Sequence, residues 1–252
     1  MDQFAIEMAS SGQATSIQWG SMLHGILMEH LPEPWPEELH LEELRPFSQW
    51  VEVKSAESFI WHIASLRDDL SEVIEILLCE KAEFEMKHNS TKLTVGAVEK
   101  KHCTLAEYMK QFFLSEEACP GVFLIFRTPT THKSSGQYAA FPSVELIAGN
   151  IRKRLCAIAP DFALADDEAY EQVLQYTRLQ RYKLESARYR LEGTGVIGYT
   201  GRVELRFYGP DPLRRLAGAL FAFAEWSGVG IKTALGMGGC EVIVRKGLKK
   251  ND

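Results

Sequence analysis

Hydrophobic positions in the first half of the chain follow the periods of strands and helices in turn. Phe4, Ile6 and Met8 alternate with polar neighbours, which predicts a strand. Within Ile17–Leu31 the apolar residues recur at helical spacing, and the three prolines of Pro32–Pro36 cannot continue that helix. The next elements are strands around Trp50–Val53 and Ser58–Ile63, a helix at Leu66–Leu78, and one or two strands within Phe84–Val98. The order strand, helix, strand, strand, helix, strand is typical of a ferredoxin-like domain.

A second cycle of the same kind begins at a buried strand, Val122–Arg127. The polar segment Thr128–Gln137 is loop-like, and Pro142 then introduces a helix at about Ser143–Ala157. After an acidic connection at Asp161–Glu171, the remaining elements are strands at Tyr182–Arg190 and Val196–Phe207, a helix at Leu213–Trp226 and a last strand at Cys240–Val244. The sequence therefore predicts an α+β fold of two tandem ferredoxin-like (RRM-like) domains, residues 1–115 and 120–246, with a glycine-rich loop in the second.

The charge of the chain is uneven. Its formal net charge of −6 argues mildly against nucleic-acid binding, but recognition depends on local potential rather than on the mean. Glu29–Glu43 is acidic, whereas Arg178–Arg190 carries five cations against one acid, Glu185. An acidic protein with a basic face therefore remains open.

The composition is that of an ordinary soluble globular protein, with 46% hydrophobic and 25% charged residues. The five cysteines are scattered without a Cys-x-x-Cys pair, so we expect neither a disulfide framework nor a zinc site. No basic region followed by an apolar stretch opens the chain, and no apolar run approaches the ~20 residues that span a bilayer. We expect a cytoplasmic protein with no membrane partner, no metal and no cofactor.

A glycine-rich segment, Ser227–Gly239, lies between the last predicted helix and strand. Glycines permit positive φ, and their N–H groups can form a concavity that binds phosphate, to which Lys232 adds a charge and Thr233 a hydroxyl. A Walker loop fails because Ile231, not glycine, precedes Lys232, and the dinucleotide fingerprint fails because Thr233 and Glu241 occupy its glycine positions. The alternative is a helix-to-strand connection that only needs tight turns.

The stretch AEWSGVGIKTALGMGG resembles the signature of the CRISPR-associated endoribonucleases that process precursor CRISPR RNA. Three weaker stretches agree in order: WGSMLHGILMEHL, LRPFSQWV and FRTPTTHKSSGQYAAFPSVELIAGNIRKRL. The resemblance implies two ferredoxin-like domains and an antiviral-defence nuclease that cuts each CRISPR repeat once, often at the base of a hairpin. It also implies a metal-independent cut, in which the 2′-hydroxyl attacks its neighbouring phosphate to leave a 2′,3′-cyclic phosphate and a 5′-hydroxyl.

The resemblance points to His24 as the catalytic histidine, because family members usually carry theirs at the matching place in MLHGIL. Histidine suits proton transfer, since its ordinary pKa of ~6.5 lies near neutral pH. A histidine packed at a helix edge is the alternative. The lysine that family members often have later in this helix is missing. The second catalytic group is therefore either His30, although six positions turn it away from His24, or a basic residue from elsewhere in the chain. His62 reads as structural, and His132 in a polar loop is a further candidate for RNA contact.

For RNA binding we favour the glycine-rich loop first and basic residues elsewhere in the second half. A solvated face explains the basic triplet at 152–154 equally well. The candidates are Lys232, Thr233, Gly230, Gly236, Gly238, Arg127, Lys133, Arg152 and Arg154.

Two alternatives to the endoribonuclease stay open. One is a non-catalytic RNA-binding subunit of a CRISPR effector complex, which would share the fold and the loop. The other is a metabolic enzyme on a duplicated ferredoxin-like fold, which the failed nucleotide motifs leave without an evident site. CRISPR repeat RNA is the expected partner, and an effector complex or a homodimer is left open.

Overall fold

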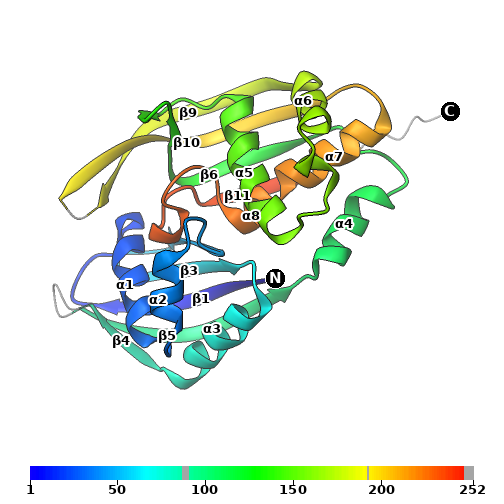
Figure 1. Cartoon of the computed structure of the whole chain (residues 1–252). Helices are drawn as coiled ribbons and strands as arrows, with labels where there is room; N and C mark the ends of the chain where they lie inside the picture. Colours follow the sequence, from blue (N-terminus) through cyan, green and yellow to red (C-terminus); the bar gives the residue numbers. More distant parts are fainter. Residues whose placement is uncertain (87–90, 192, 247–252) are drawn as a thin grey trace.

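The computed structural model describes residues 1–86, 91–191 and 193–246, and within them two antiparallel sheets lie one above the other (Figure 1). The first sheet has the order β2-β3-β1-β5-β4. Its strands are β1 (Asp2–Ser11), β2 (Phe47–Val53), β3 (Ser58–Ser65), β4 (Glu83–Met86) and β5 (Thr91–His102). Helices α1 (Gly20–His30), α2 (Trp35–Leu41) and α3 (Asp68–Glu80) lie on one side of this sheet. Without the edge strand β4, this is the strand order of a ferredoxin-like domain.

The second sheet repeats that arrangement in the order β11-β6-β10-β9. Its strands are β6 (Gly121–Thr130), β9 (Thr177–Leu191), β10 (Thr194–Phe207) and β11 (Cys240–Val244). The helices of this half are α4 (Leu105–Phe113), α5 (Val144–Ile158), α6 (Asp167–Gln175), α7 (Asp211–Ala222) and α8 (Ala224–Ser227). The prediction of an α+β fold with two ferredoxin-like halves is confirmed.

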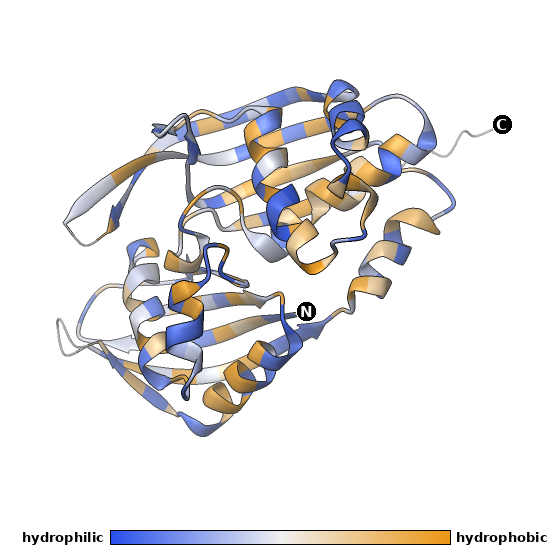
Figure 2. Ribbon diagram, viewed as in Figure 1, coloured by the Kyte–Doolittle hydropathy of each residue, from blue (hydrophilic) through white to orange (hydrophobic). Residues whose placement is uncertain are grey.

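Each half has its own hydrophobic core. In the first, Leu23 and Leu27 of α1 are fully buried among the apolar side chains of the sheet. In the second, every residue of α7 from Leu216 to Ala222 is buried, and this helix is largely orange in Figure 2. A helix needs such an apolar stripe to dock on a sheet, so the spacing of these residues fixes which face of each helix turns inward.

Each half contributes a small element to the hydrophobic core of the other half. Helix α4 packs on the second core, where the Tyr108 hydroxyl donates to the Ala219 oxygen at 2.5 Å, although it falls within predicted range 1–115. In return Ala234 of the glycine-rich loop is buried in the first core. The domain ranges therefore remain a prediction, and the two halves share structural elements.

Three parts of the sequence prediction differ from the structure. The proline-rich segment that ends α1 also starts α2, because proline is well suited to the first helical positions. The acidic connection contains the 3₁₀ turn η2 (Ala163–Ala165) and helix α6, which buries Tyr170 and Val173. The loop-like polar segment instead ends strand β6 and forms a small hairpin of β7 (His132–Ser134) and β8 (Gln137–Ala139).

Among the residues that the structure describes, no helix is long and apolar enough to cross a bilayer.

Candidate functional site

The site is centred on α1, which begins directly after the 3₁₀ turn η1 (Ile17–Trp19). Leu23 points into the core, so the next side chain, His24, lies at the edge of the buried stripe and is partly exposed. The His24 ring stacks on Phe47 at the start of β2, with ring centroids 5.9 Å apart and an angle of 13° between the planes. Helix and strand together hold the imidazole in one orientation.

Two causes lower the pKa of His24 to about 4: first its burial, then the positive charge of Arg45. The imidazole is therefore neutral at pH 7 and can accept a proton. Its Nδ1 is buried and has no hydrogen-bond partner among the described residues. A neutral, partly exposed imidazole beside a guanidinium is a suitable general base next to a phosphate.

The glycine-rich loop of the second half packs against the first turn of α1. A Cβ atom on Gly20 would lie 2.6 Å from the Gly236 Cα and 2.7 Å from the Leu235 oxygen, so only glycine allows this approach. Gly236 also has a φ of +93°, a conformation that L side chains rarely adopt. The hydroxyl of Tyr189, from β9, donates to the Leu235 oxygen at 2.9 Å. Helix, loop and the β9 strand therefore meet at the first turn of α1.

The side chain of Gln49 in β2 forms hydrogen bonds to both α1 and the glycine-rich loop. Its amide nitrogen donates to the Gly20 oxygen at 3.1 Å and to the Ala234 oxygen at 2.7 Å. Its amide oxygen accepts from Trp61 Nε1 at 2.6 Å. Both polar atoms of this buried side chain are hydrogen-bonded, and its nitrogen joins the loop to the first domain.

Most of the backbone N–H groups of the loop have acceptors within the protein. Those of Gly228–Ile231 and Leu235–Gly239 all donate internally. Gly230 donates to Asn150 Oδ1 at 2.8 Å, and Gly238 donates to the Pro129 oxygen at 3.1 Å. A phosphate cradle made by the N–H groups of Gly230, Gly236 and Gly238, as expected from the sequence, is therefore not what the structure shows. These glycines shape the loop and let it approach α1.

The side chains of three other predicted RNA-binding residues form hydrogen bonds or ion pairs within the protein. Arg154 is buried and donates to the Ser227 oxygen at 2.6 Å and to Thr233 Oγ1 at 2.5 Å. The Thr233 hydroxyl therefore serves the loop itself. Arg152 donates to the Leu164 oxygen at 2.5 Å and pairs with Asp167 at 2.7 Å. Burial and internal hydrogen bonds give Arg152, Thr233 and Arg154 structural roles.

The remaining predicted cations are available to a ligand. Lys232 has a left-handed backbone, is partly exposed, and forms no ion pair among the described residues. Lys133 of β7 is exposed and is likewise unpaired within the described part of the chain. Arg127 is 46% exposed and pairs with Glu241 at 2.7 Å, an exchangeable surface contact.

His24 and His30 do not converge. Six residues along an α-helix correspond to a rotation of about 240° and a rise of about 9 Å. His24 stacks on Phe47 of β2, whereas His30 contacts Phe84 of β4 edge-on at 5.3 Å, and these strands are the opposite edges of the sheet. His30 Nδ1 also bonds the Ile26 oxygen at 2.9 Å. The pairing of His30 with His24 is therefore not supported by the geometry.

The other two histidines singled out from the sequence have internal partners. His62 stacks on Trp50 at 4.0 Å and bonds Glu52 at 3.1 Å, as expected of a structural side chain. His132 is buried and bonds the Tyr199 hydroxyl at 2.9 Å. The proposal that His132 touches RNA is wrong for this conformation because its side chain is enclosed.

Arg45, Gln49 and Tyr189 escaped the sequence analysis. Arg45 and Gln49 both lie in LRPFSQWV, one of the stretches that carry the family resemblance, and this was the available signal. Tyr189 had no such signal, since its role depends on a contact with Leu235 that is formed only in the fold.

Among residues 1–86, 91–191 and 193–246, no group of three or more His, Cys, Asp or Glu side chains is placed to hold a metal ion.

Comparison with known proteins shows similarity to one family. The model of the CRISPR-associated endoribonuclease Cas6 family matches residues 124–240. A Streptococcus thermophilus CRISPR-associated endoribonuclease Cas6 is 28% identical over 223 residues, which cover 88% of this chain and 90% of the relative. The same-named protein of Mycobacterium tuberculosis (strain CDC 1551 / Oshkosh) is 29% identical over 226 residues, covering 88% and 71%.

The fold has counterparts among solved structures. A Cas6 product complex superposes with a TM-score of 0.81 at 18% identity, covering 96% of this chain and 99% of that one. This likeness extends over both ferredoxin-like halves, and it agrees with the sequence relatives. The chain is therefore similar to the CRISPR-associated endoribonucleases of the Cas6 family in sequence, and to a Cas6 structure in fold.

Proposed function

We propose that this chain cuts CRISPR repeat RNA within precursor transcripts, without a metal, using His24 as the general base. It is an endoribonuclease that processes precursor CRISPR RNA, and the residues and the chemical course are our proposal. One observation supports the role of His24 most strongly. It is a partly exposed imidazole, kept neutral by burial and by Arg45, on the helix against which the glycine-rich loop packs.

The proposed reaction is a transesterification within the RNA. His24 takes the proton of the 2′-hydroxyl, and the 2′-oxygen forms a bond to the adjacent phosphorus. The bond from phosphorus to the 5′-oxygen breaks, and that oxygen takes a proton from water to leave as a 5′-hydroxyl, while protonated His24 returns its proton to the solvent. The other product ends in a 2′,3′-cyclic phosphate. Because Nδ1 of His24 is buried, we assign proton transfer to Nε2.

Arg45 is the proposed electrostatic partner of His24. Its charge acts on the His24 imidazole, and its Nε donates to the Leu39 oxygen at 3.2 Å, which limits its movement. A fixed guanidinium can stabilise the charge that develops on the phosphate oxygens in the transition state. This role replaces the one that His30 was expected to fill.

Lys232, Arg127 and Lys133 are the proposed phosphate contacts. They belong to the loop and to β6 and β7, and their side chains reach the surface. The glycine-rich loop contributes by position: it fixes Lys232 close to the first turn of α1 through the contact of Gly236 with Gly20.

The cytoplasmic location expected from the sequence is part of this proposal. It is supported by five free cysteines, which suit a reducing compartment. An effector complex and a homodimer remain predictions.

A cleavage assay tests the proposal. A repeat RNA labelled at its 5′ end is incubated with the chain in excess EDTA and resolved on a denaturing gel. We expect one cut per repeat, and treatment of the labelled fragment with a phosphatase able to open cyclic phosphates should reveal its 2′,3′-cyclic end. A chain that binds the repeat but leaves it intact would instead be a non-catalytic RNA-binding subunit. Cutting that stops in EDTA would overturn the metal-independent course.

A further inference from the structure

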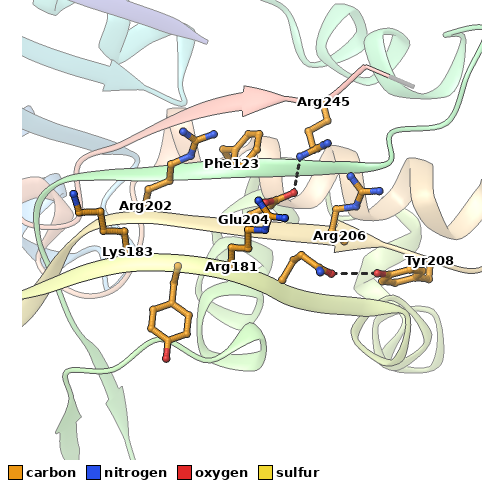
Figure 3. A pocket seen from close by; sticks show the side chains of 10 residues that line it. Phe123, Arg181, Lys183, Arg202, Glu204, Arg206, Tyr208 and Arg245 are labelled. Carbon is orange, nitrogen blue, oxygen red and sulfur yellow. Dashed lines mark hydrogen bonds and ion pairs between the residues drawn. The ribbon is translucent and has the colours of Figure 1, made fainter. Parts of the chain in front are cut away.

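The open face of the second sheet is strongly basic. Successive side chains of a strand point to opposite faces of the sheet. Val203 and the residues paired with it on β6 and β9 therefore face the helices, and the residues on either side of them in each strand face away. On that outer face Arg202 lies opposite Lys183 of β9, and Glu204 lies opposite Arg181 of β9 and Phe123 of β6. Figure 3 shows these side chains on adjacent strands of the sheet, where they line a hollow. The volume of this hollow is about 600 Å³. The residues of this surface, which we call the sheet-face hollow, include Phe123, Arg181, Lys183, Arg202, Arg206 and Arg245.

The charge of the hollow contrasts with that of the chain. The chain has a formal net charge of −6, yet five cations and one acid line this surface. The acid, Glu204, is 9% exposed and already pairs with Arg245 at 2.5 Å. Arg181, Lys183 and Arg202 are exposed and form no ion pair among the described residues, so they hold uncompensated charge on one face. Such a concentration of like charge favours an anionic ligand.

An aromatic ring lies within this charged surface. The guanidinium carbon of Arg202 is 3.7 Å from the Phe123 ring centroid, and that of Arg245 is 5.1 Å from it. Stacking on a ring holds a guanidinium plane in place, and such planes, like aromatic rings, can receive an unpaired base. Tyr208, 48% exposed, stands at the end of the same hollow.

We propose that the sheet-face hollow binds a single-stranded segment of the RNA that flanks the cut repeat. Phosphates would lie along Arg181, Lys183 and Arg206, and a base would stack on the guanidinium of Arg202. A single-stranded nucleic acid is bound by cations, which contact its phosphates, together with planar groups, on which its bases stack. An acidic protein bound at the same surface would use only the cations. This inference rests on the proposed function, since that function supplies the RNA.

The hollow is connected to the proposed active site through β9. Lys183 and Tyr189 are six residues apart on this strand, about 20 Å. Near Tyr189 this strand is bonded to Gln18, which lies just before α1. The Gln18 side chain donates to the Arg188 oxygen at 3.0 Å and accepts from the Arg190 N–H at 2.6 Å. One strand therefore joins the first turn of α1 to the hollow, so RNA held at His24 can extend onto this face.

Three RNAs separate this proposal from the proposed function: the minimal repeat, the repeat with a single-stranded uridine extension at its 5′ end, and the repeat with that extension at its 3′ end. Fluorescence polarisation gives the affinities across a salt series. We expect wild-type protein to bind one extended RNA about 10-fold more tightly than the minimal repeat. In the double variant R181Q/K183Q this gain should vanish, and the salt slope for the extended RNA should fall by about 1.4, since each phosphate contact on a single strand contributes ~0.7.

Two further variants make the test specific. R202K keeps the charge but loses the planar group, so it should weaken the extended RNA about 10-fold with an unchanged salt slope. The matched control K81A/K110A removes two exposed cations elsewhere and should leave the gain intact. Cleavage of the minimal repeat should be unaffected in all of them.

Equal wild-type affinity for the minimal and both extended RNAs would overturn the proposal, as would equal losses in R181Q/K183Q for all three. If R202K has no effect and polyglutamate competes as well as oligouridine, the surface recognises acidic protein and the RNA proposal is wrong. Failure to cut any repeat would refute the proposed function instead, and the comparison of affinities would still decide whether the hollow binds RNA.

Discussion

The side-chain amide of Gln49 donates a hydrogen bond to the backbone oxygen of Ala234 at 2.7 Å, across 185 positions of sequence. This bond ties the glycine-rich loop of the second domain to strand β2 of the first. The same amide nitrogen donates to the Gly20 oxygen, so one buried side chain fixes the loop relative to the helix that carries His24. The loop therefore acts as a structural bridge to the active-site helix.

Replacing Gln49 by Met should destabilise the protein and lower its cleavage rate. The substitution leaves the Trp61 N–H and the oxygens of Gly20 and Ala234 without their partner in a buried place. Since each such group costs about 1–3 kcal/mol, we expect the free energy of unfolding to fall by at least ~2 kcal/mol. Chemical denaturation measures this, with exposed Gln172→Met of α6 as the control, expected within ~0.5 kcal/mol of wild type. Similar losses in both variants would contradict the role of Gln49.

Two alanine substitutions on one helix should have opposite effects. A Cβ on Gly20 would meet the Tyr189 hydroxyl at 2.5 Å and the Gly236 Cα at 2.6 Å, whereas one on exposed Gly25 would meet nothing within 4 Å. Gly20→Ala should cost about 1–3 kcal/mol through overpacking and should reduce cleavage by moving the loop. Gly25→Ala should stabilise by about 0.5–1 kcal/mol, because alanine suits a helix interior better. Thermal unfolding distinguishes them, and a neutral Gly20→Ala would show that the close approach is not needed.

Lys232 and Arg154, both expected from the sequence to bind RNA, should separate into a binding and a structural role. Lys232→Ala should weaken repeat binding and lower the salt slope by about 0.7–0.9 while leaving the melting temperature unchanged. Arg154→Met removes the donor to Ser227 and Thr233 inside the protein, so it should lower the melting temperature and leave the salt slope unchanged. A stable Arg154→Met protein with a reduced salt slope would reverse these assignments.

Much of the fold could be predicted because its strands and helices carry clear periodicity. The last strand, Cys240–Val244, has the bounds that its apolar run predicted. Helix α6 was missed because its acidic residues dominate the segment, although Tyr170, Val173 and Leu174 already had helical spacing. Helix α2 was missed because the prolines of Pro32–Pro36 suggested a break, whereas Pro34 and Pro36 lie at its start.

The site was harder to predict than the fold. His24 came from a resemblance, and its pKa depends on Arg45, 21 residues away in sequence. The loop was expected to use its N–H groups for phosphate, but their acceptors include Asn150, 80 positions earlier in the chain. A local motif shows that glycines permit an unusual backbone, but it does not show which distant groups that backbone will meet.

The pH dependence of cleavage should follow the His24 imidazole. Burial and the charge of Arg45 lower its pKa to about 4, so a general base at this position gives kcat/KM that rises with pH near 4 and is level from pH 6 to 8. Arg45→Gln removes the second cause, so the rising limb should move to higher pH, and the plateau should fall because the guanidinium no longer stabilises the phosphate.

The protonation of His24 also makes the stability of the fold depend on pH in the same pH range. Unfolded His24 gains a proton as pH falls below ~6.5, whereas folded His24 stays neutral to about 4, so the unfolded state binds more protons and His24 lowers stability as pH falls through this window. Rates should therefore be taken as initial rates, with folding monitored by circular dichroism. A limb that stays in place or moves to lower pH in Arg45→Gln would argue against the coupling of Arg45 to His24.

The central claim is that His24 drives the cut, and the comparison of wild type with His24→Ala on a labelled repeat RNA tests it most directly. A denaturing gel gives the single-turnover rate, and fluorescence polarisation on the same RNA gives the affinity. We predict that His24→Ala cuts at least ~100-fold more slowly, as loss of a general base requires, while its affinity stays within about threefold of wild type. Cleavage by His24→Ala at the wild-type rate would contradict the assignment.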